Sequence, residues 1–549
     1  MTDFVQPPPV AGNRFRTDPS LRLALAWRLP DDMFEQAKPA LERMGRLADE
    51  TMHPLAAEAE ARQPQHTPYD AWGRRIDRID VDASWQELVA IGQREGLVAL
   101  PHEAPYGEHS RLVQAGLIHL YDPASAVADC PLVMTDGAIS LLREHDPALA
   151  DRYVPRLTAR ENAWTSGQWM TEKTGGSDVS ATATAAYINA DGSWSLHGTK
   201  WFTSAATSDM ALALARPDGA ESGNRGLSLF LIELRDAQGD WNGIQVRRLK
   251  DKLGTRALPT AEVDLVGARA LPVGALGDGV RKLTGLLNIA RFWAAIGGPA
   301  GVGHLLALAR DYAHKRVAFG RPLAQNAVHR RWLARIAAQY DAMLMLNLET
   351  ACHQGRMEHG GDGELARLLA PLNKLACARQ SVTAASELLE SFGGAGYLED
   401  TGIPRIFRNL HVHCIWEGTT SVLAHDVLRA LAAGNGGEAF ADEIARRMGR
   451  LRHEATAGVR HRLEGALDTL MPLINDPVEA GARRIAWGMA KTYQALLLAE
   501  FAEWRFDTHG DRAGFAAAEI FAGDGLVDAP FPNAQSATLD ALAFGRIHP

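Results

Sequence analysis

The sequence is poor in cysteine, and its few cysteines lie far apart. Cys130, Cys352, Cys377 and Cys414 are the only ones among 549 residues, and none forms a CxxC pair. Disulfide frameworks and zinc sites require abundant or closely spaced cysteines. The pattern therefore argues against a cysteine-based metal site and against a disulfide scaffold. We expect a protein of the reducing cytoplasm that holds no metal.

Long apolar runs are also missing. The segment from Met1 to Gln6 has neither a basic stretch nor an apolar core, so no secretory leader is expected. We find no uninterrupted apolar run of about 18 residues, the length that a transmembrane helix needs. The sequence therefore predicts no membrane-spanning segment.

Aromatic residues make up only 7% of the chain, whereas alanine is abundant, and this composition favours helices. The net charge of -9 keeps the chain soluble and argues against a protein that coats nucleic acid over its whole surface. At this length the chain exceeds one typical core, so two to four domains are expected.

What the chain does have is a hydrophobic period that changes along its length. Residues 1–163 are mainly helical in pattern, with proline-rich breaks at 64–69 and 101–106. Residues 164–275 shift towards a period of two, and residues 276–434 return to a helical period. After the linker-like Asn435-Gly436-Gly437, residues 435–549 are again helical. We predict an α+β fold with a helical N-terminal domain, a middle β domain, a four-helix bundle and an extra C-terminal helical domain.

Within the middle segment, Ala181–Ile188 alternates as a strand does, and Asp191-Gly192-Ser193 predicts a hairpin turn into Trp194–His197. The bundle is expected to contain four long helices separated by glycine or proline. These are Val280–Phe319, Val328–Glu358, Glu364–Phe392 and Thr419–Ala432.

Four short segments carry residues suited to a ligand site, although each also has a plainer explanation. Met170–Asp178 combines hydroxyls with Gly175-Gly176, which suits close approach of backbone to a cofactor but is more often a simple turn. In Lys200–Ser204, Trp201 could stack on a planar ring or simply fill a core. Arg316–Arg321 and Glu390–Gly396 could contact phosphates or merely end two helices.

Glu417 stands between an aromatic residue and a Gly-Thr pair, just before an apolar helical run. A lone carboxylate in this setting does not by itself predict a catalytic site. It does so only together with the other segments. No Gly-x-Gly element follows a βαβ pattern, so a Rossmann nucleotide site is not expected.

Together these segments resemble the acyl-CoA dehydrogenase superfamily of flavoproteins. The matching motifs are Met170-Thr171-Glu172-x-x-Gly175-Gly176-Ser177-Asp178, the spaced set from Glu390 to Asn409, and Trp416-Glu417-Gly418-Thr419. Trp169 departs from the small residue usual at the start of the first motif. Within the superfamily the chain is most similar to the AidB branch of alkylation-stress flavoproteins. Leu249–Gly254, the segment from Tyr69 to Arg75, Trp416 before the base and the C-terminal extension carry that likeness.

The resemblance implies FAD as cofactor and assigns a role to each matching position. The residues expected to bind FAD are Met170, Thr171, Gly176, Ser177, Trp201, Phe202, Thr203, Arg316, Phe319, Glu390, Gly393, Gly394, Trp416, Gly418, Thr419 and Ser421. In the family, the positions of Arg316 and Phe319 contact a cofactor bound largely by the neighbouring subunit, which implies a dimer and commonly a tetramer. The family often has Gln where Glu390 stands, and Ala327 replaces a common FAD-contacting Gln.

The resemblance also implies the catalytic residues. Glu417 would remove the α-proton of an acyl-CoA while hydride leaves for flavin N5, and Arg291 would support the base or merely pair within the bundle. Some relatives place the base directly before the arginine that matches Arg291. Here that position is Ala290, which leaves Glu417 as the only candidate. An electron-transfer partner is a further possibility.

The AidB branch is associated with duplex DNA, and the C-terminal region is rich in arginine. Arg446, Arg447, Arg450, Arg452, Arg460 and Arg462 are expected to form an arginine-rich helix that meets phosphates, with a solvated, salt-bridged helix as the alternative. Two functions stay open. One is an AidB-like, DNA-associated dehydrogenase homologue with weak activity. The other is an ordinary metabolic dehydrogenase of short or branched, isovaleryl-type acyl-CoAs.

Overall fold

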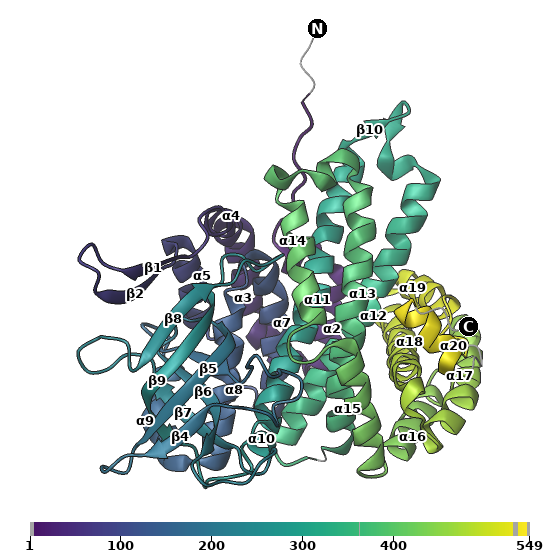
Figure 1. Cartoon of the computed structure of the whole chain (residues 1–549). Coiled ribbons are helices and arrows are strands. Elements are labelled where there is room, and N and C mark those ends of the chain that lie inside the picture. Colours follow the sequence, from purple (N-terminus) through teal and green to yellow (C-terminus); the bar gives the residue numbers. More distant parts are fainter. Residues whose placement is uncertain (1–4, 362, 531–535, 546–549) are drawn as a thin grey trace.

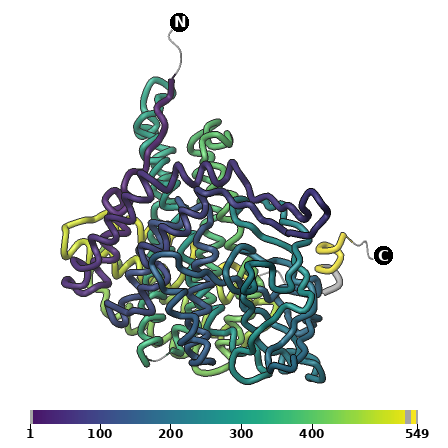
Figure 2. Tube along the Cα trace, turned by 90° about the vertical axis from the view of Figure 1, so that its left-hand side faces the viewer, coloured from purple at the N-terminus to yellow at the C-terminus, as the bar shows by residue number. Residues whose placement is uncertain are grey.

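The computed structural model describes residues 5–361, 363–530 and 536–545. Helices dominate, and a single larger sheet lies beside them (Figure 1). The predicted α+β architecture is confirmed, with helices first, a β domain in the middle and helices to the end. The chain runs from the helices behind the sheet, through the sheet, into the central bundle and then to the helices at the far side (Figures 1 and 2).

Several helices of the N-terminal region are capped by polar side chains. Asp82 caps α5 by accepting from the backbone N–H of Ser84, and Asp146 caps α9, which opens with a proline. A π-helical turn joins α3 to α4. The helices are α1 (Arg14–Thr17), α2 (Pro19–Arg28), α3 (Asp31–Leu47), α4 (His53–Ala61), α5 (Ala83–Arg94), α6 (Ala99–Glu103), α7 (Ser110–Tyr121), α8 (Asp129–His145) and α9 (Pro147–Leu157).

One part of this region is not helical. The proline-rich stretch expected to be a break forms β1 (Gln65–Tyr69), which pairs with β2 (Arg75–Asp80) as an antiparallel hairpin. Asp77 fixes the hairpin to the middle domain, because its buried carboxylate accepts from Arg75 and from the backbone N–H of Val246.

The middle domain is a seven-stranded sheet that closes on itself. The strand order is β3-β6-β4-β5-β9-β7, β8 pairs with β9, and β6 also pairs with β7. The strands are β3 (Ser166–Trp169), β4 (Ala185–Ile188), β5 (Trp194–Ser204), β6 (Met210–Pro217), β7 (Ser228–Glu233), β8 (Ile244–Leu249) and β9 (Thr260–Pro272). The predicted turn at Asp191–Ser193 joins β4 to β5, with Gly192 at φ +82°.

The first strand of that hairpin starts later than predicted. β4 begins at Ala185, whereas Ala181 was expected to open it. The backbone N–H groups of Ala183 and Thr184 donate to the carboxylate of Glu172, so they do not take part in a ladder.

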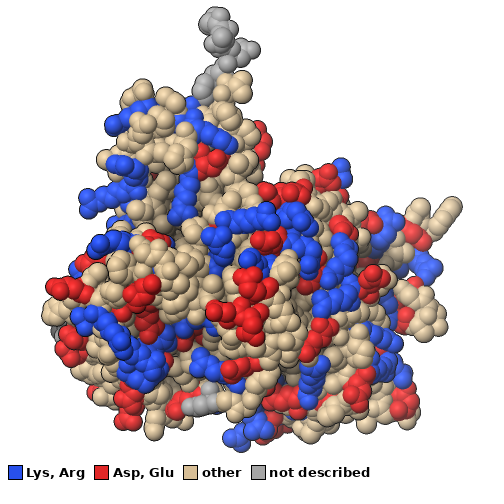
Figure 3. Space-filling view, turned by 180° about the vertical axis from the view of Figure 1, so that it is seen from behind, with Lys and Arg blue, Asp and Glu red and all other residues tan. Residues whose placement is uncertain are grey.

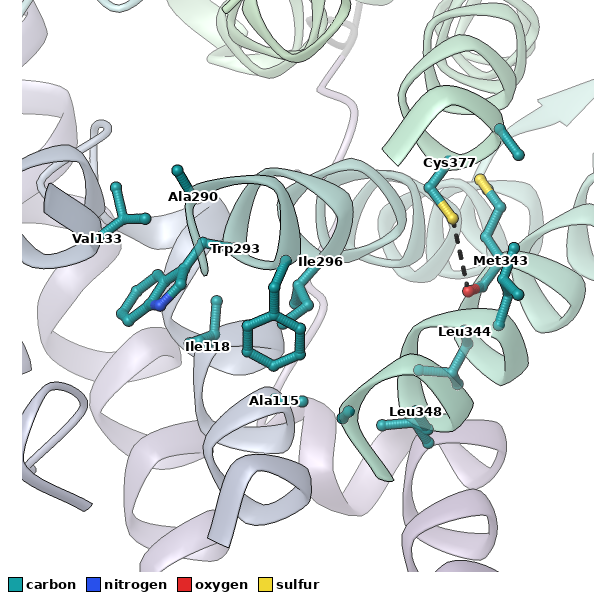
Figure 4. Packing of buried hydrophobic residues seen from close by; sticks show 14 of the residues in the cluster. Ala115, Ile118, Val133, Ala290, Trp293, Ile296, Met343, Leu344, Leu348 and Cys377 are labelled. Carbon is teal, nitrogen blue, oxygen red and sulfur yellow. Dashed lines mark hydrogen bonds between the residues drawn. The ribbon is translucent and has the colours of Figure 1, made fainter. Parts of the chain in front are cut away.

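The bundle consists of α11 (Thr284–Lys315), α12 (Ala327–Glu358), α13 (Glu364–Ser391) and α15 (Thr420–Ala432), with the short α10 (Gly279–Lys282) and α14 (Ile403–Leu410) at its ends. Figure 4 shows how α11 lies in the core, where Trp293 and Ile296 pack among side chains of neighbouring helices. Among the described residues, α11 alone is long and apolar enough to cross a membrane. Since 89% of its most apolar window is buried, it is the core helix of the bundle.

The ends of α11 and α13 project from the body of the molecule (Figures 1 and 2). The hairpin β10 (Val317–Ala318) and β11 (Arg321–Pro322) follows α11, and the 3-10 turn η5 (Gly393–Tyr397) follows α13. The rings of Tyr312 and Phe392 lie 5.3 Å apart and hold these two helix ends together. The C-terminal helices then pack against the bundle, chiefly through α18. They are α16 (Gly436–Met448), α17 (Ala457–Asn475), α18 (Ala482–His509), α19 (Ala513–Gly523) and α20 (Ser536–Phe544).

Candidate active site

Glu417 lies in the short loop between the 3-10 turn η7 (His411–Cys414) and α15. Its backbone is left-handed, with φ +54°, and Gly418 follows at φ +107°. Such a conformation costs about 1–3 kcal/mol in a residue with a side chain and persists only where the surroundings enforce it. Thr419 then starts α15 by accepting from the backbone N–H of Val422. The loop therefore turns sharply at Glu417 before the helix begins.

Two cations hold this loop from the bundle. The ammonium of Lys374, on α13, donates to the carbonyl oxygens of Trp416 at 2.8 Å and of Gly418 at 2.5 Å. Arg291, on α11, donates through Nε to the carbonyl of Glu417 at 3.3 Å and pairs with Asp426 of α15 at 2.5 Å. Arg291 thus fixes the loop and does not act as an isolated bundle ion pair.

Burial raises the pKa of Glu417, while the positive charges of Arg291 and Lys374 oppose that rise. Burial also lowers the pKa of Lys374 to about 8, against the opposing effect of the Glu417 charge. A carboxylate with a raised pKa holds a proton more readily than a solvated one, while the fixed cations favour its ionised form. This is the property that a general base requires.

The Glu417 carboxylate lies close enough to the start of α8 for its charge to act on the thiol of Cys130. The charges of Asp129 and Glu417 both add to the effect of burial in raising the pKa of the Cys130 thiol, whereas Ser204 opposes that rise. Ser204 is the last residue of β5, three positions after Trp201. Glu417 therefore lies near the N-terminal helices as well as the bundle.

The loop Met170–Asp178 is anchored at this junction by a buried ion pair. Glu172 pairs with Lys200 at 2.7 Å, and it also accepts from Ala183 and Thr184. A side chain at Gly175 would collide with the carbonyl of Asp178, so this turn requires glycine. Met170 is buried and Thr171 half-buried, whereas Gly176 and Ser177 are exposed. The anchor leaves the glycine-serine tip open to a ligand.

Trp201 and Phe202 lie where the pairing of β5 with β9 shifts register, between Lys200 and Thr203. Irregularities of this kind turn side chains out of the regular alternation and are common beside functional sites. The backbone N–H of Trp201 donates to the carbonyl of Thr171 at 2.9 Å, which joins the two predicted segments. The ammonium of Lys250 lies 3.7 Å from the centroid of Trp201. Thr203 is fully buried, and its hydroxyl donates to the carbonyl of Ala261.

The remaining predicted cofactor residues fall into two places. Trp416, Gly418, Thr419 and Ser421 accompany Glu417. In the described part of the chain, the buried indole N–H of Trp416 has no hydrogen-bond partner. Arg316, Phe319, Glu390, Gly393 and Gly394 lie instead at the projecting end of the bundle. There Phe319 is 95% exposed, and a Cβ added at Gly393 or Gly394 would meet nothing within 4 Å.

The arginines of the C-terminal region do not form one helix, which corrects the prediction. Arg446 and Arg447 are on α16, Arg460 and Arg462 are on α17, and Arg450 and Arg452 lie between these helices. Arg447 is buried and pairs with Glu349, Glu443 and Glu500, because helical spacing places it on the inner face beside Ile444. Arg446 pairs with Glu443 and Arg462 with Glu519.

Carboxylates therefore surround most of this arginine set. A hollow of about 420 Å³ is lined by Arg446, Arg447 and Arg450 together with Glu349, Glu443, Glu500 and Glu503. On the face shown in Figure 3, basic and acidic side chains are intermixed.

Comparisons with known proteins agree with this geometry. Family models match over most of the chain: the AidB N-terminal domain at residues 5–162, the acyl-CoA dehydrogenase middle domain at 167–267 and the acyl-CoA dehydrogenase C-terminal domain at 277–432. Acyl-CoA dehydrogenase family member 11 of Caenorhabditis elegans is 37% identical, over 91% of this chain and 86% of that protein. This chain belongs to the acyl-CoA dehydrogenase family.

Two further relatives refine the assignment. The putative acyl-CoA dehydrogenase AidB of Escherichia coli is 33% identical, over 68% of this chain and 70% of that protein. The crystal structure of Caenorhabditis elegans ACDH-11 in complex with C11-CoA superimposes with a TM-score of 0.95 at 34% identity, covering 99% of this chain and 97% of that one. The predicted AidB-like acyl-CoA dehydrogenase is thus confirmed as a family assignment, and with it an oxidoreductase that uses FAD.

The residues of this chain fit the cofactor of the family. A planar ring needs a flat wall and hydrogen-bond donors, and Trp201, the open tip at Gly176-Ser177 and the unpartnered indole N–H of Trp416 provide them. Bare backbone at Gly393 and Gly394 leaves room for a phosphate-bearing group. One chain carries these two sets of residues at different ends of its bundle.

Sequence reasoning missed three residues of this site. Lys374 binds the base loop, and Glu172 and Lys200 anchor the predicted cofactor loop. The available signal was a lone lysine within the apolar run of α13, and another within a β strand. A lysine in such a position is buried only if a partner satisfies it.

Proposed function

We propose that this protein oxidises acyl-CoA thioesters with FAD as cofactor and Glu417 as the general base. The single observation that carries the proposal is the Glu417 carboxylate. It stands on a left-handed turn, its pKa is raised by burial, and its charge acts on the Cys130 thiol at the start of α8. The C11-CoA held by ACDH-11 supports thioesters of coenzyme A as the substrate class.

In this proposal the chain's own residues orient the substrate and move one proton. Glu417 takes the α-proton, and the positive charges of Arg291 and Lys374 favour the ionised form of its carboxylate. The backbone N–H of Glu417 polarises the thioester carbonyl, which makes the α-proton acidic enough to leave. FAD, when bound, supplies an acceptor for the hydride that departs from the β-carbon.

Cofactor retention is proposed to need more than one subunit. Met170, Thr171, Gly176, Ser177, Trp201, Phe202 and Thr203 would hold the ring end with the Trp416–Ser421 loop. Arg316, Phe319, Glu390, Gly393 and Gly394 would reach the nucleotide end of a cofactor bound by a second copy. The exposure of Phe319 and Tyr397, 95% and 88%, supports a homotetramer assembled through this projecting end.

The test is an anaerobic titration of the FAD-loaded protein with acyl-CoAs, from isovaleryl-CoA to undecanoyl-CoA, while the visible flavin band is recorded. We expect bleaching by at least one thioester, and a rate that falls by about 10³-fold or more in Glu417→Gln. Bleaching at the wild-type rate in Glu417→Gln would overturn the role of the base. The best substrate would separate an isovaleryl-type enzyme from one for longer chains.

Duplex DNA is the second proposed ligand, supported by the likeness to AidB and by the exposed Arg450 and Arg452. The surface is now limited to Arg446, Arg450 and Arg452, since Arg447 is buried and Arg460 and Arg462 are half-buried. Salt-sensitive retention of duplex DNA, lost when these three become Ala, is expected for an AidB-like role. Retention that survives the triple change would remove this surface, and no retention at all would leave the ordinary metabolic dehydrogenase.

We also propose a cytoplasmic location and an electron-transfer protein as the oxidant of the reduced enzyme. Scattered cysteines without a disulfide among the described residues are compatible with the first. Rapid reoxidation of the bleached protein by an added electron-transfer flavoprotein, but not by air alone, would support the second.

A further inference from the structure

Lys374 is a charged residue in an otherwise apolar stretch of α13. It is fully buried between Asn373 and Leu375, and its ammonium lies against the loop that carries Glu417. A buried ammonium is costly unless its donors are satisfied. Lys374 uses them on the carbonyls of Trp416 and Gly418, at 2.8 Å and 2.5 Å, the residues on either side of the base.

The loop therefore has three successive carbonyl groups bound by two cations. Those of Trp416 and Gly418 accept from Lys374, and that of Glu417 accepts from Arg291 at 3.3 Å. Drawing the outer two carbonyls onto one ammonium stabilises the left-handed turn at Glu417 between them. Charge-assisted bonds of this kind are stronger than neutral ones.

We propose that Lys374 is the positioning residue of the active site: its ammonium fixes the turn that aims the Glu417 carboxylate and favours the ionised form of that carboxylate. The inference rests on the proposed function, in which Glu417 is the base. It gives Lys374 two separable contributions, one through geometry and one through charge.

The charge contribution has a predictable sign. Four titratable or charged groups interact with Lys374: Glu417, Cys414, Arg291 and His413. His413 stays neutral, because burial and the Lys374 charge lower its pKa to about 3. Arg291 and Lys374 both lower the pKa of Glu417, so removing the charge of Lys374 raises it. The acid limb of the rate profile then moves towards higher pH.

The experiment uses the FAD-loaded full chain and three substitutions. Lys374→Met removes donor and charge, Lys374→Gln keeps a donor without charge, and Lys374→Arg keeps both in a larger group. The anaerobic rate of flavin reduction by the best acyl-CoA is measured from mildly acidic to mildly alkaline pH, together with FAD content and unfolding midpoint. Lys282→Met is the matched control, because Lys282 also donates to two loop carbonyls, of Val273 and Ala275.

We expect Lys374→Met to lower the rate on the order of 100-fold, since a misaimed base loses its near-attack geometry. Its acid limb should lie at higher pH than in the wild type. Lys374→Gln should recover part of the rate, but the acid limb of its rate profile should stay at the higher pH. Lys374→Arg should return the acid limb to its wild-type pH. Lys282→Met should leave both unchanged.

The inference is overturned if Lys374→Met reduces flavin at the wild-type rate with an unmoved acid limb. It is also overturned if the rate falls only in proportion to lost FAD. If Lys374→Met does not fold, the test is the pH position of the acid limb in Lys374→Gln and Lys374→Arg. Acid limbs at the same pH in these two variants refute the charge role. Failure of the proposed function is a distinct result, namely an undiminished rate in Glu417→Gln.

Discussion

The two ends of the bundle present their predicted site residues in opposite ways. At the base end, Glu417 is half-buried, and the carbonyl groups of its loop are bound by Lys374 and Arg291. At the projecting end, Phe319 is almost fully exposed, and Gly393 and Gly394 face open space. The same helices, α11 and α13, supply residues to both.

The difference indicates that the two ends of these helices have different functions. A base must be aimed within a fraction of an ångström, which a single packed chain can achieve. An exposed phenylalanine and bare glycine backbone contribute no stabilisation until another surface covers them. We therefore expect changes at the base end to affect the chemical step, and changes at the projecting end to affect cofactor retention and assembly.

The largest expected effect is that of Glu417→Asp. This change keeps the charge but withdraws the carboxylate by one methylene, so the rate of flavin reduction should fall on the order of 100-fold. FAD content should stay at the wild-type level, as measured by the absorbance ratio of flavin to protein. A loss of FAD in this variant would contradict the inference that the base end affects the chemical step and not cofactor retention.

At the projecting end, Phe319→Ser should weaken FAD retention by roughly tenfold or more, because a large apolar contact with the cofactor or second subunit is removed. The reduction rate of the subunits that still hold FAD should not change. Dialysis against buffer without FAD, followed by light scattering, measures both retention and subunit number. Ile188→Ser, at an apolar position that is 68% exposed on the β domain, serves as control.

Arg291→Met should lower the reduction rate by about tenfold, since the carbonyl of Glu417 and the carboxylate of Asp426 lose their shared partner. Asp426→Asn should have a smaller effect of the same kind. Stopped-flow reduction under saturating acyl-CoA measures the change. An effect on FAD retention alone would instead assign Arg291 to the cofactor.

The smallest expected effect is on stability as a function of pH. The pKa of Lys374 falls from its usual 10.5 to about 8 on folding. Between these values the unfolded chain binds more protons, so this group makes stability rise with pH, by at most about 1.4 kcal/mol per pH unit. Urea unfolding at pH values across this window should show a steeper rise in the wild type than in Lys374→Met. Equal slopes would mean that Lys374 keeps an ordinary pKa in the folded protein.

Much of the fold could be predicted because it follows from local patterns. The period of the hydrophobic residues predicted the bundle helices, and Asp191-Gly192-Ser193 predicted the β4–β5 hairpin. The stretch around Pro64 and Pro68 was wrongly treated as a break, because proline is tolerated in an edge hairpin that lies against another domain. The late start of β4 depends on Glu172, whose carboxylate takes the backbone N–H groups that a strand would use.

The arginines of the C-terminal region illustrate a second limit. Their abundance predicted a basic helix, but Arg447 turns inward to Glu349, which lies 98 positions earlier in the chain. No local spacing reveals such a partner. Only the packing of α16 on α12 and α18 determines which arginines remain available for a phosphate.

By itself, the sequence determined the family and the cofactor and predicted the base, since these depend on residue types at fixed local spacings such as Trp416-Glu417-Gly418-Thr419. The tertiary structure alone decided how that base is held. Lys374 and Arg291 are far from Glu417 in the chain, and only the packing of α11 and α13 brings their charges to its carbonyl groups. A hydrogen bond depends on distance in space, and burial sets its strength, so neither can be read from the order of the residues.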